Sequence, residues 1–275
     1  TFVHGALCVS YSGQCYLSYA IGGRSGNRGE CAQPCRRRYT LVDANGNALV
    51  EDRFLLSLKD LNLSNHLGDL LDAGLHSFKI EGRLKDEHYV SNVVSFYRQQ
   101  LDAAMKPRGL VRSSSGQSRT GFTPDPHKTF NRSYTTHFFH GRTEPPGAIE
   151  TPKMKGERLG TVVAVGPRTF TLQTEADLHT GDGICFFGPD GNLQGTVVNH
   201  SRLGAQGVIV TPNGMDGIQH GTVIYRNRDH AFLQMLERHP PIRTVAIQIV
   251  LSETPGGFAL RAVDDGVAIA DVVDV

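Results

Sequence analysis

Four of the five cysteines of this 275-residue chain fall within its first 35 residues, at Cys8, Cys15, Cys31 and Cys35. The fifth, Cys185, stands alone in an apolar run, where we expect a buried thiol. A disulfide framework is typical of small secreted domains, whereas this chain is not very small and we expect no secretory signal before it. Clustered thiols in a reducing compartment more often bind a metal. The pattern therefore favours a metal site in a cytoplasmic protein, with disulfides as the alternative.

The spacing of the four cysteines bears on which metal they would bind. Structural zinc sites usually present two short knuckles, in which two to four residues separate the cysteines, but only Cys31 and Cys35 are that close in sequence. Three separated segments must converge, which suits an iron–sulfur cluster at least as well as zinc. Nearby glycines let backbone N–H groups approach sulfur, and nearby arginines would offset thiolate charge. These arginines are Arg24, Arg28, Arg36, Arg37 and Arg38. For any one of them, the alternative is that the side chain lies on a loop and faces solvent.

The overall charge of the chain does not indicate a strongly charged partner. The formal net charge is +1 and the isoelectric point is about 7.7, so nucleic-acid binding would have to depend on a local patch. The sequence contains no run of about 18 apolar residues that would span a membrane. We therefore expect no membrane partner, and the oligomeric state stays open.

Several stretches around the cysteines carry a resemblance to a known family. Phe2, the run Gly5–Cys8, Gly13, Cys15 and the pair Leu17–Ser18 follow one another at the spacing of a signature. This signature resembles that of the collagenase-like peptidases of family U32. Three further stretches resemble later blocks of the same family, so that the resemblance covers about residues 1–105: GRSGNRGECAQPCRRRY ending at Tyr39, LSLKDL at 56–61 and FKIEGRLK at 78–85.

Within this family the chain resembles most the RNA hydroxylation proteins that make 5-hydroxycytidine in 23S ribosomal RNA, because it continues well beyond the cysteine block. The resemblance implies an iron–sulfur-dependent RNA hydroxylase with ribosomal RNA or its assembly precursor as partner. It also implies prephenate as a co-substrate that supplies the hydroxyl group. The implied ligands of a 4Fe-4S cluster are Cys8, Cys15, Cys31 and Cys35. If the chain binds RNA, the candidate RNA-binding residues are the arginines of the cysteine block: Arg24, Arg28, Arg36, Arg37 and Arg38.

Two other functions stay open. The family's name suggests a peptidase, but the sequence contains no HExxH helix and no GxSxG turn. His4 is the nearest imidazole to Cys8, yet residues four apart on an extended strand are separated by about 13 Å. The third interpretation is a non-catalytic RNA-binding or scaffold fragment whose chemistry lies in other parts of a longer protein. The opening on an apolar strand and the apolar last run lead us to expect more chain on both sides.

Residues 1–106 have the pattern of an α/β unit. The sequence predicts a short helix over 64–74, a strand over 75–80 and a long helix over 86–105. This order predicts the tail of an α/β barrel or an open parallel sheet, and the resemblance favours a TIM-like barrel. Strand ends carry the active sites of such barrels. The candidate catalytic residues are therefore Lys79, Glu81 as acid or base, and Arg83 as an anion clamp, with a structural ion pair as the alternative.

The rest of the chain divides into three segments. Residues 107–152 mix basic and aromatic side chains, which predicts either a crossing linker or a surface that contacts RNA. Residues 153–229 alternate with a period of two between glycine-rich turns, which predicts a small all-β barrel. Its expected strands are 161–165, 169–173, 183–187, 193–199 and 206–210. Residues 230–275 predict a helix over 231–239 and the start of a further β domain, a partial β meander.

Overall fold

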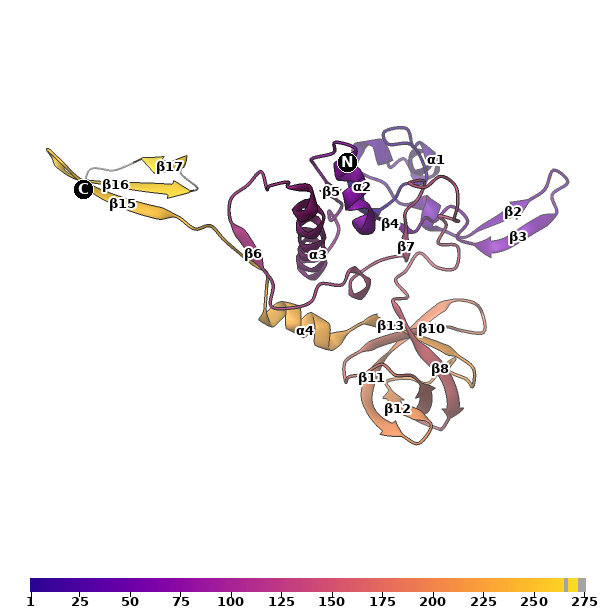
Figure 1. Cartoon of the computed structure of the whole chain (residues 1–275). Coiled ribbons are helices and arrows are strands. Elements are labelled where there is room, and N and C mark those ends of the chain that lie inside the picture. Colours follow the sequence, from indigo (N-terminus) through magenta and orange to yellow (C-terminus); the bar gives the residue numbers. More distant parts are fainter. Residues whose placement is uncertain (265–266, 272–275) are drawn as a thin grey trace.

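The N-terminal strand β1 (Phe2–Ala6) lies inside a small mixed sheet. The computed structural model describes residues 1–264 and 267–271. The sheet has the order β5-β1-β4-β7, with β4 at Asp60–Asn62, β5 at Lys79–Ile80 and β7 at Tyr134–Thr135. β1 runs parallel to β5 and antiparallel to β4, and β4 runs parallel to β7. This sheet and its helices form the α/β part of the molecule (Figure 1).

The expected tail of a TIM-like barrel is not confirmed. All strands of such a barrel run parallel, whereas β1 and β4 are antiparallel, with Ala6 opposite Asp60. A parallel neighbour needs a crossover that packs back onto the sheet, usually a helix. Between β1 and β4 the chain instead forms loops, the short helix α1 (Leu17–Gly22) and a hairpin. The fold class is therefore mixed α/β with a separate barrel.

Two helices complete the hydrophobic core of the α/β part. A 3₁₀ turn, η3 (Ser64–His66), leads into α2 (Leu67–Asp72), and α3 spans Glu87–Met105, as predicted. α3 begins at Asp86, whose side chain accepts a hydrogen bond of 2.8 Å from the backbone N–H of Tyr89. The predicted strand 75–80 pairs only at its last two residues. The buried core consists of Val3, Leu61, Leu63, Leu67, Leu70, Tyr89, Val93 and Tyr97.

The predicted small β-barrel is confirmed. Its strands close in the order β10-β11-β12-β9-β8-β13, and every neighbouring pair is antiparallel. The strand β13 (Val223–Arg228) was not among those expected. Its Arg226 is buried at a position where the alternation of the strand predicts an apolar residue. The strands are β8 (Glu157–Val165), β9 (Phe170–Gln173), β10 (Gly183–Phe187), β11 (Leu193–Gly204), β12 (Gly207–Pro212) and β13 (Val223–Arg228).

The cysteine block is built from short elements. After α1 come two 3₁₀ turns, η1 (Gly26–Arg28) and η2 (Pro34–Arg36), each close to a cysteine. The hairpin of β2 (Tyr39–Val42) and β3 (Ala48–Arg53) follows and projects away from the α/β part (Figure 1). The cysteine segments thus have little regular structure of their own, and contacts with neighbouring segments hold them in place.

Most of the segment 107–152 packs on the fold. β7 joins the mixed sheet, and β6 (Gln117–Arg119) pairs with β14 (Ile242–Thr244). η4 (Lys106–Arg108) extends α3, and η5 (Pro126–Lys128) precedes β7. Phe122 contacts Phe232 of α4 (His230–Arg238) edge to face, with ring centroids 6.2 Å apart. The aromatic residues of this segment therefore serve partly as core.

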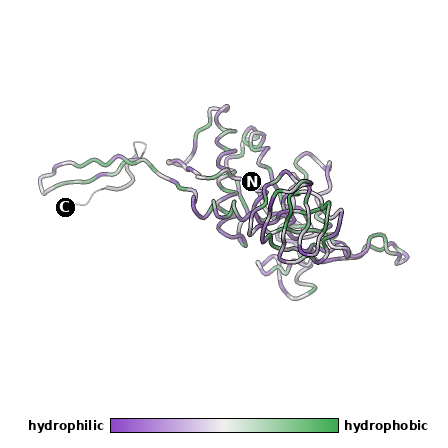
Figure 2. The backbone as a smooth tube through the Cα atoms, turned by 90° about the horizontal axis from the view of Figure 1, so that it is seen from below, coloured by the Kyte–Doolittle hydropathy of each residue, from purple (hydrophilic) through white to green (hydrophobic). Residues whose placement is uncertain are grey.

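The C-terminal meander consists of β15 (Gln248–Thr254), β16 (Gly257–Asp264) and β17 (Val267–Asp271). It extends away from the other parts in Figure 1, and Figure 2 shows hydrophobic residues along this part of the chain. The remaining positions of the predicted last domain, 265–266 and 272–275, lie outside the described residues. In the part of the chain that the structure describes, no helix combines the length and apolar character needed to cross a bilayer.

Candidate functional site

The topology of the mixed sheet brings several candidate residues to one edge. β1 and β5 are parallel, so the segments that follow them, towards Cys8 and Glu81, leave the sheet on the same side. Asp60 begins β4 opposite Ala6, and Tyr134 begins β7 beside Asp60. The cysteine block, the segment 81–85 and the starts of β4 and β7 therefore meet at this edge.

The four N-terminal cysteines gather around Cys35. All five cysteines of the chain are free thiols, so the disulfide alternative is not realised. Burial raises the pKa of the Cys35 thiol, the guanidinium of Arg36 acts in the opposite direction, and charge on Cys31, Cys8 and Cys15 raises it further. These interactions place the other three thiols within electrostatic range of Cys35.

The donor set at this site fits an iron–sulfur cluster in the number and kind of its ligands. Four thiols from three segments are available, and the backbone N–H of Gln33 donates to Cys31 Sγ at 3.3 Å. Hydrogen bonds to sulfur of this kind tune cluster potentials. At Gly26 a Cβ atom would lie 3.8 Å from Cys31 Sγ, so backbone approaches the thiols closely. Among the described residues, no three His, Cys, Asp or Glu side chains gather tightly enough for a single metal ion.

The five arginines of the cysteine block differ in their contacts. Arg36 donates to Ser57 Oγ at 2.8 Å and to the carbonyl of Leu7 at 3.1 Å. It thereby ties the Cys35 turn to the end of β1. Arg24 donates to the carbonyl of Glu30 at 2.9 Å.

Arg38 lies between two parts of the molecule. Its guanidinium bonds Asp52 at 2.6 Å and Asn192 Oδ1 in the β10–β11 turn at 2.6 Å. Arg28 and Arg37 are exposed. The arginines thus include residues that hold the cysteine block in place and residues that face solvent.

The predicted catalytic residues Lys79, Glu81 and Arg83 lie beside the cysteine block. Lys79 is exposed and its ammonium lies 3.5 Å from the Glu81 carboxylate. That carboxylate also accepts from the backbone N–H of Arg83 at 3.1 Å. Arg83 in turn donates to the carbonyl of Gly29 at 3.4 Å, two residues before Cys31. The trio therefore links the end of β5 to the cysteine block, and it contains the ion pair that was the alternative interpretation.

A buried imidazole, His4, lies on β1 among three tyrosines. Its Nδ1 is 3.2 Å from the hydroxyl of Tyr97, and its ring also contacts Tyr89 and Tyr134. Burial lowers the pKa of His4 to about 4, and the nearby positive charges of His127 and Lys85 act in the same direction. His4 is therefore neutral at pH 7 and bonds a tyrosine rather than a thiol.

Lys85 is the most unusual cation at this edge. Its ammonium lies over the ring of Phe130, 3.4 Å from the centroid, and 5.3 Å from the centroid of Tyr89. It forms no hydrogen bond or ion pair with any residue that the structure describes. Burial lowers the pKa of Lys85 to about 8. Its three N–H donors are therefore available to a ligand.

A buried ion pair lies next to Lys85. Arg132 bonds Asp60 at 3.2 Å, through both its side chain and its backbone N–H, and Asp60 is 2% exposed. Lys85 ends the FKIEGRLK stretch and Asp60 lies in the LSLKDL stretch, so both residues belong to stretches that carry the family resemblance. The sequence led us to Lys79, Glu81 and Arg83 instead, because nothing in the sequence distinguishes a lysine packed against aromatic rings, such as Lys85, from one that faces solvent.

Comparison with known proteins places this arrangement in a family. The model of the family described as "Peptidase family U32" matches residues 1–148, which include the cysteine block and the whole mixed sheet. The chain belongs to Peptidase family U32. The family resemblance found in the sequence is thereby confirmed.

Relatives in this family carry different functional names. The chain is 39% identical over 99% of its length to the 23S rRNA 5-hydroxycytidine C2501 synthase of Escherichia coli, covering 43% of that protein. It is 37% identical to the tRNA hydroxylation protein P1 of Bacillus subtilis, over 69% of this chain and 46% of that protein. It is 32% identical to a collagenase of Porphyromonas gingivalis, over 68% of this chain and 52% of that protein.

The chain thus spans about half the length of the curated relatives it matches, or somewhat less. No solved structure matches it significantly.

Proposed function

We propose that this chain is part of an enzyme that hydroxylates cytidine in 23S ribosomal RNA. The observation that carries the proposal is the extent of the match to the E. coli synthase, which covers 99% of the chain. The family model ends at residue 148, and the tRNA-modifying and collagenase relatives match between 44% and 77% of the chain. The match to the ribosomal RNA enzyme therefore includes the barrel and the C-terminal meander.

Cys8, Cys15, Cys31 and Cys35 would hold a 4Fe-4S cluster at the edge of the mixed sheet. Four cysteine thiolates are the usual ligands of such a cluster. When bound, the cluster would supply one-electron transfer. Arg36 would partly offset the thiolate charge, and its bonds to Ser57 and Leu7 would hold the Cys35 turn in position.

Lys85 would bind an anionic group of the substrate or co-substrate. Its ammonium lies over the rings of Phe130 and Tyr89 and has no carboxylate or carbonyl partner among the described residues, which supports this role because the rings position the charge without neutralising it. Prephenate, which carries carboxylates, is the co-substrate that we propose as hydroxyl source. Glu81 and Arg83 would fix the segment that carries Lys85 against the cysteine block.

Peptide hydrolysis has less support from the site. A cysteine nucleophile needs a base that lowers its pKa, but burial raises the pKa of Cys35 and His4 is bonded to Tyr97. The names of the family model and of the collagenase and protease relatives favour it. The scaffold alternative stays open, and the same experiment tests it.

The test is nucleoside analysis of ribosomal RNA. The gene that encodes the chain is deleted from its host, and 23S and transfer RNA are digested separately and analysed by mass spectrometry. We expect loss of 5-hydroxycytidine from 23S RNA alone. The native gene and its Cys185→Ala variant should restore it, and the Cys31→Ala variant should not.

Other results would lead elsewhere. Loss of a hydroxylated nucleoside from transfer RNA would show that the enzyme acts on transfer RNA instead of 23S RNA. Unchanged RNA in the deletion strain would refute hydroxylation and return the peptidase and scaffold alternatives.

A further inference from the structure

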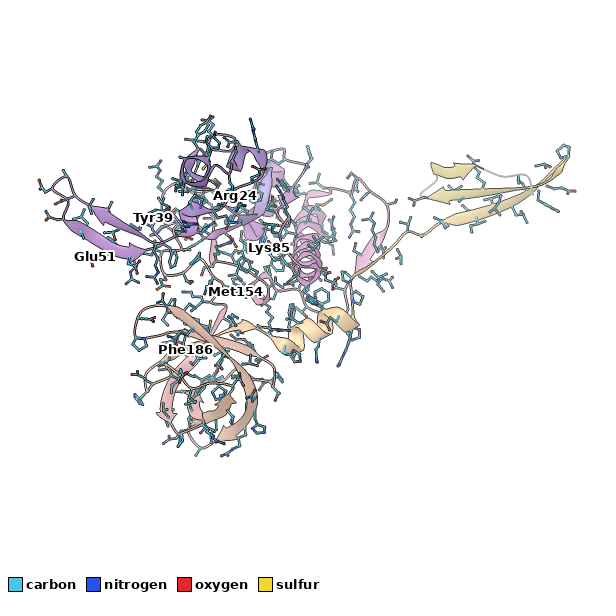
Figure 3. The ribbon with its side chains drawn as sticks, turned by 180° about the vertical axis from the view of Figure 1, so that it is seen from behind. Arg24, Tyr39, Glu51, Lys85, Met154 and Phe186 are labelled. Carbon is cyan, nitrogen blue, oxygen red and sulfur yellow. The ribbon has the colours of Figure 1, made fainter. Side chains whose placement is uncertain are left out.

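A pocket of about 260 Å³ lies beside the mixed sheet, near the start of the barrel, and the proposed chemistry does not use it. Its walls include Lys59, Arg132, the turn 147–151, Lys153 and Lys155. Met154, between two of these lysines, lies between the α/β part and the barrel in Figure 3. The backbone holds the walls together, since Lys59 N donates to the carbonyl of Pro146 at 2.9 Å and Ala148 N to that of Ser57 at 2.7 Å.

The charges on the pocket walls are mostly positive. Four cations line it with one carboxylate, Glu150, which already pairs with Lys155 at 3.0 Å. Arg132 pairs with the buried Asp60. Lys59 and Lys153 form no ion pair with any described residue, and the ammonium of Lys59 donates to the carbonyl of Pro145 at 3.1 Å.

One further carboxylate, Glu144, lies near Lys59. Hydrogen bonds from Thr135 and Thr136 are the main causes that lower the pKa of Glu144, and the charge of Lys59 lowers it further. These two threonines already engage its Oε1 atom. The pocket therefore retains an excess of positive charge, and a concave surface of this kind attracts anions.

The pocket is next to the cysteine block. The segment Ser57–Leu58 separates the two: Arg36 donates to Ser57 Oγ on one side, and Ala148 N donates to the carbonyl of Ser57 on the other. Arg36 directly follows Cys35. This one segment of chain would therefore separate an anion held in the pocket from the turn that carries Cys35.

We propose that this pocket binds a backbone phosphate of the RNA substrate, and the inference rests on the proposed function. Among the described residues, the lining contains no aromatic ring on which a base would stack. Its lysines are flexible point charges, which suit phosphate oxygens. Phosphate contacts set the register of a nucleic acid rather than read its sequence. A phosphate held here would place a neighbouring nucleotide at the edge that carries Lys85 and the cysteines.

The test compares RNA binding of the full chain and its Lys59→Gln/Lys153→Gln variant. Binding to a 23S ribosomal RNA transcript is measured by fluorescence anisotropy at several salt concentrations. We expect binding to weaken about five- to tenfold near 0.1 M salt, and the slope of log affinity against log salt to fall by about one. The matched control is Arg168→Gln/Arg202→Gln, which removes the same charge from exposed positions on the barrel.

Four results would overturn or redirect the inference. An equal loss in the control variant would show a general charge effect and refute the pocket. Unchanged affinity and slope in a protein that still hydroxylates RNA would refute the pocket and leave the proposed function intact. Calorimetric loss of prephenate binding with an unchanged RNA slope would assign the pocket to a small anion instead. A wild-type chain that binds no 23S RNA and restores no 5-hydroxycytidine would refute the proposed function itself.

Discussion

Two cysteine side chains with different surroundings provide a direct test of the metal site. Cys35 lies beside Arg36 and three other thiols, whereas Cys185 is buried in the barrel, donates to the carbonyl of Lys155 at 3.3 Å and has its pKa raised by burial to about 11. We expect anaerobically prepared Cys35→Ala protein to lose its iron and sulfide, because a cubane cluster needs four ligands. The Cys185→Ala control should keep both, as measured by iron, sulfide and zinc analysis.

Stoichiometric zinc in the wild-type chain would contradict the cluster. Iron retained by Cys35→Ala would exclude that thiol as a ligand.

His4 makes the stability of the α/β part depend on pH. Its pKa is about 4 in the folded chain and 6.5 in the unfolded one, so its contribution is fully present above pH 6.5 and is lost as the pH falls towards 4. This difference corresponds to about 3 kcal/mol of unfolding free energy. Urea unfolding, followed by tyrosine fluorescence between pH 7 and 4, should show this loss.

The His4→Gln variant should lack this part of the pH dependence while keeping a polar group near Tyr97. Equal slopes in the two proteins would show that other groups cause the acid destabilisation. A second measurement is the NMR titration of the His4 ring, which should show no protonation between pH 7 and 5.

The site residues differ in how far sequence alone could predict them. The four thiols were predictable because cysteines are rare and their clustering is visible. His4, Asp60 and Lys85 were not, because burial and partners give these residues their character, and those come from segments up to 130 positions away, such as Tyr134.

At the scale of single elements, the barrel depends on a close approach between β8 and β9. A Cβ atom at Gly160 would lie 1.9 Å from the carbonyl oxygen of Gln173. We therefore expect Gly160→Ala to destabilise the barrel by about 2 to 4 kcal/mol, as measured by thermal unfolding. Gly195→Ala is the matched control, because its Cβ would lie 3.5 Å from the nearest atom, an ordinary contact. Similar melting temperatures for the two variants would contradict this interpretation.

The elements show which patterns sequence carries reliably. The period of two and the glycine-rich turns predicted the barrel, and apolar spacing with a capping residue predicted α3. The direction of β4 relative to β1 was not predictable, because three-residue strands carry no signal for their partners. β13 was not predicted because Arg226 breaks the alternation of apolar and polar residues. Its charge is buried only because carboxylates from other elements neutralise it, and the sequence of the strand does not show those partners.

At the scale of the whole molecule, Arg226 connects the barrel to the rest of the chain. Its guanidinium bonds Glu157 at 2.8 Å and the buried Asp182 at 3.3 Å, and lies 3.7 Å from Asp229. Asp229 begins α4 and pairs with Lys128 of η5 at 2.6 Å. This network forms ionic contacts between the barrel, α4 and the segment that leads into β7.

We expect Arg226→Met to lower the unfolding free energy of the barrel by about 3 to 5 kcal/mol, because Asp182 would be left buried without its counterion. Calorimetry should show the barrel transition at a lower temperature and separated from that of the α/β part. The Arg158→Met variant removes an exposed arginine from β8 and should change little. A single unshifted transition in Arg226→Met would refute this role.

The place of β1 within its sheet has a consequence for the order of events during synthesis. β1 pairs with residues 60–62 and 79–80, and β4 next to it pairs with residues 134–135. Contacts this distant in sequence form slowly, because long loops must close first. A ribosome must therefore translate beyond Thr135 before the sheet edge beside the cysteines is complete, so the thiols made first would be among the last to reach their final positions. Delivery of a cofactor to them would follow translation of the α/β part rather than accompany it.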